Sequence, residues 1–241
     1  MQIKQLKWPH FENRKSDRPI KYIIIHCFAF PIRKNLTLWN KLGIGPHYLI
    51  DQKGNISQFV AENKIAWHAG KSSWHKEVGL NAASIGIELY SPSFGQKPYP
   101  KAQIEALKEL IKDIMKRHHI LPQNVLGHSD VAPTRKVDPG ICFPWAEMAK
   151  KGIGLWPKKM GCTKTHKHNK TLLREIGYDV TDEKAALLAF VRHFMPNLLP
   201  LEKDVQLIEK HLPKQIAQMP KADKMIRDQL ICVADAYTKK H

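Results

Sequence analysis

Three residues near the ends of predicted strands or in the loops that follow them carry side chains that could bind a catalytic metal. His26 ends the apolar run YIIIH, His128 lies in LGHSD, and Asp138 lies in KVDPG. A catalytic zinc needs about three nitrogen or oxygen ligands and one open position for water, and separate elements usually supply the ligands. Two imidazoles and one carboxylate would meet this requirement. No compact motif such as HExxH fixes the choice, so from the residues alone a core histidine bonded to the backbone is the stronger interpretation for His26.

A carboxylate interrupts the otherwise apolar stretch SIGIELY, at Glu88. Strict alternation along a strand places Ile85 and Ile87 on one face and Glu88 on the other. Because an unpaired buried carboxylate is costly, Glu88 lies either on a solvent face or in a site. If it faces a metal, desolvation would raise its pKa and make it a general base for the attacking water.

Lys136 and an aromatic loop complete the candidate chemistry. In an extended loop Lys136 and Asp138 point to the same side, where an ammonium group could stabilise an oxyanion. A solvated lysine is the simpler interpretation, since the chain holds many lysines. In AWHAGKSSW, the residues Trp67, His68 and Trp74 suit a groove for sugar or peptide, and they suit a packed loop with buried indoles as well.

Two further groups of residues carry less chemical information. The stretch CTKTHKH contains Cys162, His166 and His168, which lack the paired spacing of a zinc finger. Cys27 neighbours a candidate ligand, but a cysteine within a strand is more often a small buried hydrophobe than a nucleophile.

Short β-rich runs and one long helix must position these side chains. Residues 22–29 are predicted to form a buried strand, residues 48–51 and 55–60 a hairpin, and residues 84–90 another strand. Residues 100–119 are predicted to be helical, because apolar side chains recur three and four apart on one face. A short strand ends near His128, and residues 129–145 contain three prolines and indicate an ordered loop. The pattern is typical of an α/β domain.

The chain is predicted to divide into two domains. Residues 1–150 form the first, and residues 151–170 form a linker with six lysines and no acidic residue. Residues 171–241 are expected to form a small all-α domain with helices over 171–177, 182–194 and 221–239 and a further one over 201–212. Thr181 or Asp182 is placed to cap the second of these helices, and Gly177 to end the first.

Composition narrows the choice of partner and compartment. The formal net charge of +17 favours an anionic partner, such as nucleic acid, anionic lipid or a bacterial cell-wall polymer. The longest apolar runs fall short of the ~18 residues that a membrane span needs. The first ten residues lack the apolar stretch of a secretory signal, so a cytoplasmic location is expected, with the periplasm or cell envelope as the alternative. Four scattered cysteines favour free thiols in a reducing compartment.

Four segments together resemble a known family of hydrolases. The segments YIIIHCFA, GPHYLIDQKGNISQFVAENKIAWHAGKSSW, LNAASIGIELY and NVLGHSDVAPTRKVDPGICFPW have the order and spacing of the zinc-dependent, type-2 N-acetylmuramoyl-L-alanine amidases. The resemblance covers residues 20–146 and is strongest to the bacterial wall-recycling and envelope branch. It implies a mixed central β-sheet flanked by helices. More faintly, GYDVTDEKAALLAFVRHFMP resembles the helical peptidoglycan-binding domain that follows the catalytic domain in some of these enzymes.

The resemblance implies a role for each candidate residue. His26, His128 and Asp138 would bind one Zn²⁺ per chain, Glu88 would orient or deprotonate the attacking water, and Lys136 would stabilise the oxyanion. The scissile bond would be the amide between N-acetylmuramic acid, including its 1,6-anhydro form, and L-alanine of the peptidoglycan stem peptide. The substrate groove would be lined by His47, Trp67 and His68. Peptidoglycan or muropeptides would be the partners, and a monomer is the default expectation.

Two alternatives from other classes of protein are distinguishable. A muropeptide-binding protein without activity would be favoured by loss of a zinc ligand, and all three ligand positions are filled here. A nucleic-acid-binding protein is indicated by the charge alone, and no recognition helix, RNP-like motif or zinc finger is recognisable in the sequence.

Overall fold

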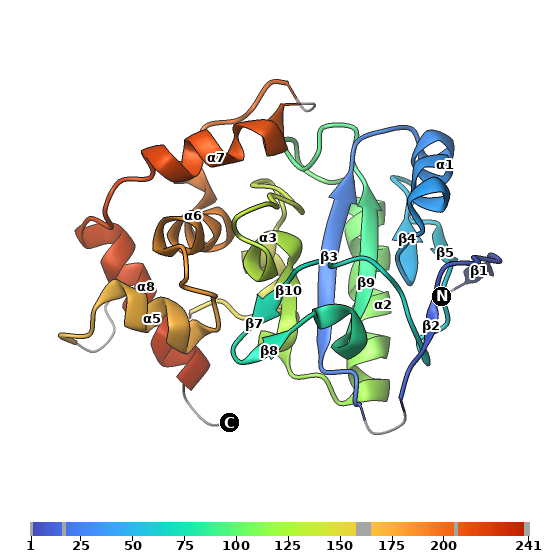
Figure 1. Cartoon of the computed structure of the whole chain (residues 1–241), viewed down its shortest axis with the longest axis horizontal. Coiled ribbons are helices and arrows are strands. Elements are labelled where there is room, and N and C mark those ends of the chain that lie inside the picture. The colour runs from blue at the N-terminus through green and yellow to red at the C-terminus, as the bar shows by residue number, and fades with distance from the viewer. Residues whose placement is uncertain (1, 16–17, 158–164, 205–206, 239–241) are drawn as a thin grey trace.

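The computed structural model describes residues 2–15, 18–157, 165–204 and 207–238. Its centre is a six-stranded sheet in the order β1-β5-β4-β9-β3-β10 (Figure 1). The strands are β1 (Ile3–Gln5), β3 (Tyr22–Phe28), β4 (Tyr48–Ile50), β5 (Ile56–Gln58), β9 (Ser84–Tyr90) and β10 (Val125–Gly127). The β4–β5 hairpin is antiparallel and the other neighbouring pairs are parallel. This mixed sheet confirms the predicted fold class.

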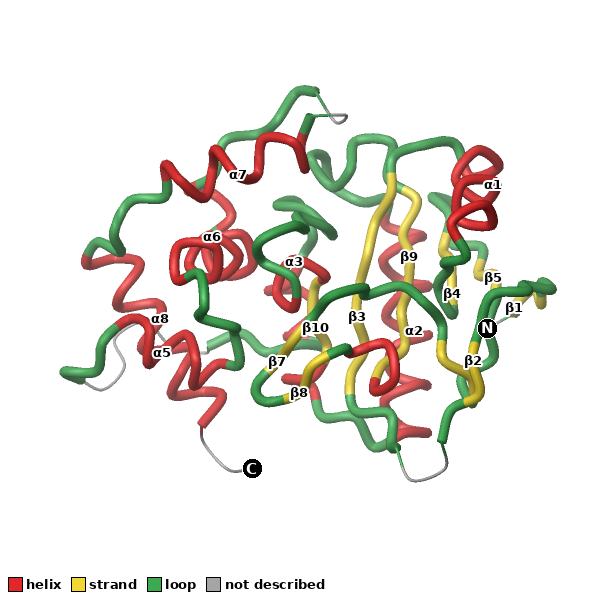
Figure 2. The backbone as a smooth tube through the Cα atoms, viewed as in Figure 1, coloured by secondary structure: helices red, strands yellow, loops and turns green. Residues whose placement is uncertain are grey.

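Helices and two small ribbons surround the sheet (Figure 2). The α-helices are α1 (Ile32–Leu42), α2 (Lys101–His118), α3 (His128–Val131), α4 (Trp145–Lys150), α5 (Asn169–Ile176), α6 (Glu183–Phe194), α7 (Ile208–Gln218) and α8 (Lys224–Thr238). The 3-10 helices are η1 (Leu80–Ala83), η2 (Pro122–Asn124) and η3 (Pro196–Leu198). The two-stranded ribbons pair β2 (Glu12–Asn13) with β6 (Lys64–Ile65) and β7 (Ser73–Trp74) with β8 (Glu77–Val78). None of the helices in the described ranges is both long and apolar enough to cross a membrane.

Helix α2 covers one face of the sheet. Leu107, Leu110 and Ile111 on one face of α2 are fully buried and pack in one cluster with Ile23 and Ile85 of the central strands. The predicted three- and four-residue spacing therefore marks the face that contacts the sheet. Every residue of β3 is buried, as expected for a parallel strand covered on both faces.

The C-terminal helices share a second core with the sheet. A single buried cluster contains Ile24 and Leu126 of the sheet together with Leu173, Phe190 and Leu230 of α5, α6 and α8. In Figure 1 these orange and red helices lie beside the β10 edge. The apolar packing is thus continuous between the two predicted domains. The middle of the predicted linker, residues 158–164, lies outside the described residues.

Local signals set the ends of these helices. Gly177 follows α5 with φ +131°, and the Asp182 side chain accepts a 3.0 Å hydrogen bond from the Ala185 N–H at the start of α6. Both predictions are confirmed. The helix expected over residues 201–212 begins at Ile208 and runs to Gln218, so that prediction was wrong at both ends.

Candidate metal centre

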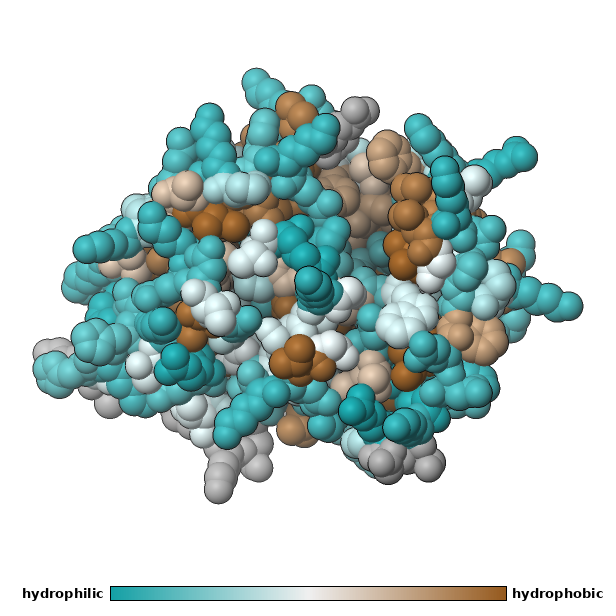
Figure 3. All heavy atoms as spheres, viewed as in Figure 1, coloured by the Kyte–Doolittle hydropathy of each residue, from teal (hydrophilic) through white to brown (hydrophobic). Residues whose placement is uncertain are grey.

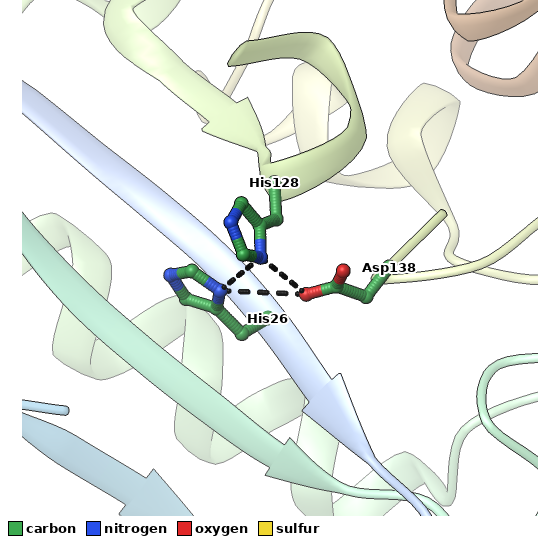
Figure 4. Close-up of side chains that lie close together, drawn as sticks. All are labelled: His26, His128 and Asp138. Atoms are coloured by element: carbon green, nitrogen blue, oxygen red, sulfur yellow. Dashed lines mark hydrogen bonds and ion pairs between the residues drawn. The ribbon is translucent and has the colours of Figure 1, made fainter. Parts of the chain in front are cut away.

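Three side chains from separate elements meet at the carboxyl end of the central strands (Figure 4). His26 lies on β3, His128 begins α3 directly after β10, and Asp138 follows in the next loop. His128 Nδ1 is 2.9 Å from His26 Nδ1 and 3.0 Å from Asp138 Oδ2, and the last two atoms are 3.4 Å apart. All three residues are buried, and Asp138 Oδ1 has no hydrogen-bond partner. The structure therefore brings the predicted ligands together.

This donor set fits a divalent metal ion. Two imidazoles and a carboxylate form the kind of three-ligand set found in catalytic zinc sites. Burial is the main reason why the pKa of His26 is lowered to about 4, and the neighbouring His128 lowers it further. His26 is therefore neutral near pH 7, the state in which imidazole binds metals. Burial raises the pKa of Asp138, but His128 and His26 outweigh it and hold this pKa well below its ordinary value.

The loop that contains His68 and Ala69 orients both imidazoles from behind. His26 Nε2 lies 2.9 Å from His68 Nδ1, and His128 Nε2 lies 3.2 Å from the Ala69 carbonyl oxygen. Such contacts on the far ring nitrogen fix the orientation of a metal-binding histidine. Arg135 in turn donates to the Ala69 and Lys71 carbonyls, which ties this loop to the one that carries Asp138. His68 was expected in the substrate groove, and no sequence pattern predicts this supporting contact.

A glycine and a buried histidine complete the support. A Cβ atom on Gly86 would lie 2.4 Å from the His68 ring, so a side chain at position 86 would displace the ring. The amide of Gly86 donates to His47 Nδ1 at 3.0 Å, and His47 Nε2 lies 3.2 Å from the Lys64 carbonyl oxygen. His47 is completely buried, and both ring nitrogens face backbone groups. His47 was expected to line the substrate groove, but it has no ring nitrogen free for a substrate.

Glu88 lies beside the candidate ligands. It is in register with His26 across the β3–β9 pair, which places both side chains on one face of the sheet. Glu88 is partly buried, and its Oε2 atom has no hydrogen-bond partner. Burial and the Asp138 carboxylate raise the pKa of Glu88 well above its ordinary value, and the Lys136 ammonium opposes that rise. An unsatisfied carboxylate with a raised pKa is suited to accept a proton.

Lys136 is partly buried, and its Nζ atom lies 2.8 Å from Glu209 Oε1 on α7. Burial lowers the pKa of Lys136, but Asp138 and Glu209 outweigh burial and raise it above the ordinary value. The side chain therefore stays cationic at neutral pH. No local sequence pattern marks the contact with Glu209.

A groove of about 930 Å³ adjoins the centre. Trp67 and Arg135 line it, together with basic residues of the N-terminal segment such as Arg14. The candidate ligands and Glu88 are not part of its walls, but the groove borders the loop that contains His68 and Ala69. Trp67 is partly exposed there, while Trp74 is buried in the core shared with α5.

None of the three cysteines in the described residues contributes to this centre. Cys27, Cys142 and Cys232 are free, and burial is the main cause that raises the pKa of the Cys27 thiol well above its ordinary value. Such a thiol is a poor nucleophile at neutral pH. Cys162 lies outside the described residues.

Two imidazoles and two carboxylates gathered near the ends of the sheet strands form a donor set of the kind found in metal-dependent hydrolases. Residues 16–141 match the family model described as N-acetylmuramoyl-L-alanine amidase. The chain is 38% identical to the N-acetylmuramoyl-L-alanine amidase AmiD of Escherichia coli over 218 residues, covering 78% of this chain and 79% of AmiD. It therefore belongs to the type-2 N-acetylmuramoyl-L-alanine amidase family.

Other similarities extend over different lengths. The chain is 39% identical to the 1,6-anhydro-N-acetylmuramyl-L-alanine amidase AmpD of Enterobacter cloacae, covering 57% of this chain and 83% of AmpD. The structure of E. coli AmiD with anhydro-N-acetylmuramic acid-L-Ala-D-γ-Glu-L-Lys aligns with a TM-score of 0.70 at 32% identity, covering 94% of this chain and 91% of AmiD. AmpDh3 of Pseudomonas aeruginosa, bound to an anhydromuramic pentapeptide, aligns with a TM-score of 0.73 at 26% identity, covering 93% and 96%.

Proposed function

We propose that this protein hydrolyses the amide bond between N-acetylmuramic acid and L-alanine of peptidoglycan, with zinc bound by His26, His128 and Asp138. The observation that carries the proposal is the convergence of these three side chains beside Glu88, an unsatisfied carboxylate with a raised pKa. The anhydro-muropeptides bound to the solved relatives support this substrate class, including its 1,6-anhydro form.

The residues of this chain divide the reaction among them. Zinc bound there would polarise the scissile carbonyl and lower the pKa of a water ligand to about 7. Glu88 accepts the proton of the attacking water and passes it to the departing amine of L-alanine. The Lys136 ammonium donates to the oxyanion that forms on the carbonyl oxygen. His68 and the Ala69 carbonyl keep the two imidazoles oriented throughout.

The groove beside the centre supplies the substrate contacts in this proposal. Trp67 offers an aromatic face for a sugar or peptide group. Arg135 and Arg14 make that wall cationic, which suits the free carboxylates of a stem peptide. His68 would influence the substrate indirectly, because it orients the ring of His26.

Hydrolysis tests the proposal directly. The zinc-loaded protein is given soluble anhydro-muropeptides and intact sacculi, and released stem peptide is identified by mass spectrometry. We expect Glu88→Gln to keep its zinc and lose activity by about 10²–10⁴-fold, whereas His128→Ala loses the metal as well. Glu105→Gln, an exposed substitution on α2, is the matched control. Lack of release from both substrates, or full activity of Glu88→Gln, would contradict the proposal, and the first result would favour a muropeptide-binding protein without activity.

The helical segment, residues 171–241, is proposed to bind the polymer. A second groove, of about 1250 Å³, lies between the β7–β8 ribbon and α5, and Lys76, Lys170 and Arg174 are among its lining residues. Hydrophilic residues cover most of the face shown in Figure 3. We expect the Lys170→Glu, Arg174→Glu double variant to co-sediment less with sacculi than Lys112→Glu, a control on α2. Equal co-sedimentation would contradict this role.

A further inference from the structure

The helical segment places a carboxylate at the active site. Glu209, in the first turn of α7, forms a 2.8 Å ion pair with Lys136, two residues before the ligand Asp138 in the chain. The pair links residues 73 positions apart. In Figure 1 the N-terminal end of α7 lies near the upper end of the sheet, where β3 and β9 end.

Packing explains why these two side chains meet. Val137, which follows Lys136, and Ile208, which precedes Glu209, belong to the same buried cluster and line the same small cavity. Leu212, one turn further along α7, is buried in that cluster as well. The start of α7 is therefore held against the loop that carries Lys136. An acidic side chain in the first turn of a helix is also stabilised as an anion by the helix dipole.

The ion pair fixes the ammonium group on the loop that carries Asp138, two residues from that candidate ligand. In this position the Lys136 charge lowers the pKa of both Glu88 and His26. An ammonium group has three N–H donors, so a contact with one carboxylate oxygen leaves donors for an oxyanion. A lysine side chain has about 2 kcal/mol of rotamer entropy, and an anchored ammonium loses less of it during catalysis.

We propose that Glu209 is a positioning residue for the amidase reaction, because its carboxylate holds the Lys136 ammonium where the oxyanion forms. The inference rests on the proposed function, since Lys136 must itself act on the oxyanion. It gives the helical segment a part in catalysis in addition to any contact with the polymer.

Steady-state kinetics on a soluble anhydro-muropeptide test the inference with the full-length, zinc-loaded chain. We expect Glu209→Gln to lower kcat by about three- to tenfold, with KM, zinc content and Tm close to those of the unmodified protein. Glu209→Asp keeps the charge and should restore most of the rate. Glu202→Gln is the matched control. It changes a carboxylate that lies 2.8 Å from His211, which is on α7 like Glu209, and it leaves Lys136 paired.

A double-mutant cycle separates this inference from the proposed function. In a Lys136→Ala background, Glu209→Gln should cause no further loss of kcat. Full activity of Lys136→Ala would overturn the proposed role of Lys136. A slow Lys136→Ala variant with an unchanged Glu209→Gln rate would overturn only the positioning role. A rise in kcat for Glu209→Gln would also overturn it, since the carboxylate would then mask the ammonium.

Discussion

The phenol of Tyr178 should make a measurable contribution to stability, because it meets a buried carboxylate between α3 and the helical segment. Its hydroxyl donates to Asp130 Oδ1 at 2.8 Å, while Asp130 Oδ2 accepts from the Gly127 amide and lies 2.8 Å from His193 Nδ1. Tyr178→Phe keeps the ring packed against Trp74 and removes only the hydroxyl. Losing a hydrogen bond to a charged, buried acceptor costs about 2 kcal/mol, which for a chain of this size lowers Tm by about 4–8 °C.

Thermal and urea denaturation followed by circular dichroism measure this loss. Tyr237→Phe is the matched control, because the Tyr237 hydroxyl is 3.5 Å from the Gln123 carbonyl oxygen and loses little when removed. We expect a single transition in both variants, since α5, α6 and α8 share a core with the sheet. If Tyr178→Phe costs no more than Tyr237→Phe, the hydroxyl does not stabilise this network and the reasoning is refuted.

Three further changes have defined outcomes. Gly177→Ala should lower the free energy of unfolding by about 2–3 kcal/mol, because φ is +131° and the new Cβ would lie 2.5 Å from the Trp74 ring; a loss below about 1 kcal/mol would show that the junction relaxes. Glu62 is buried, which raises its pKa, but hydrogen bonds from Arg117 and His118 outweigh burial and lower it from 4.5 to about 2. A carboxyl group whose pKa is lower in the folded state than in the unfolded state stabilises the folded protein at pH values above its unfolded pKa. Glu62→Gln should therefore cost up to about 3 kcal/mol at neutral pH. The difference in urea denaturation between this variant and the unmodified protein should shrink between pH 4.5 and 2. Removal of the metal with a chelator should abolish hydrolysis and lower Tm, with both restored by zinc; hydrolysis by protein shown to be metal-free by elemental analysis would contradict the centre.

The sequence predicted the elements that carry a clear period or cap. The strand over residues 84–90 matches β9 at both ends, and the helix over 100–119 matches α2 within one residue at each end. Helix α1 was not anticipated, although Ile32, Leu36 and Trp39 recur four and three residues apart and pack in one cluster. The short strands β2, β6, β7 and β8 have two residues each, too few for alternation to register.

The candidate ligands could be predicted from residue types and the family resemblance, but their supporting contacts could not. The residue types supplied the candidate ligands, the family resemblance selected them, and the structure assembles them from β3, α3 and the following loop. The supporting contacts of His68 and Ala69 depend on where a loop folds back, which no local pattern encodes. The same holds for Glu209, since its partner lies 73 positions away and the pairing depends on how α7 packs.

The shared core also limits how this gene can be recombined with those of its relatives. An exchange at the basic linker would separate Trp74 from Gly177 and Asp130 from Tyr178, pairs that contact each other across the junction. A chimaera would then carry a helical segment from one parent against a sheet edge from the other, with mismatched side chains in one apolar cluster. Viable exchanges would have to transfer α3, the β7–β8 ribbon and α5–α8 together. The segments that contact one another must therefore come from the same parent, even where they are far apart in the chain.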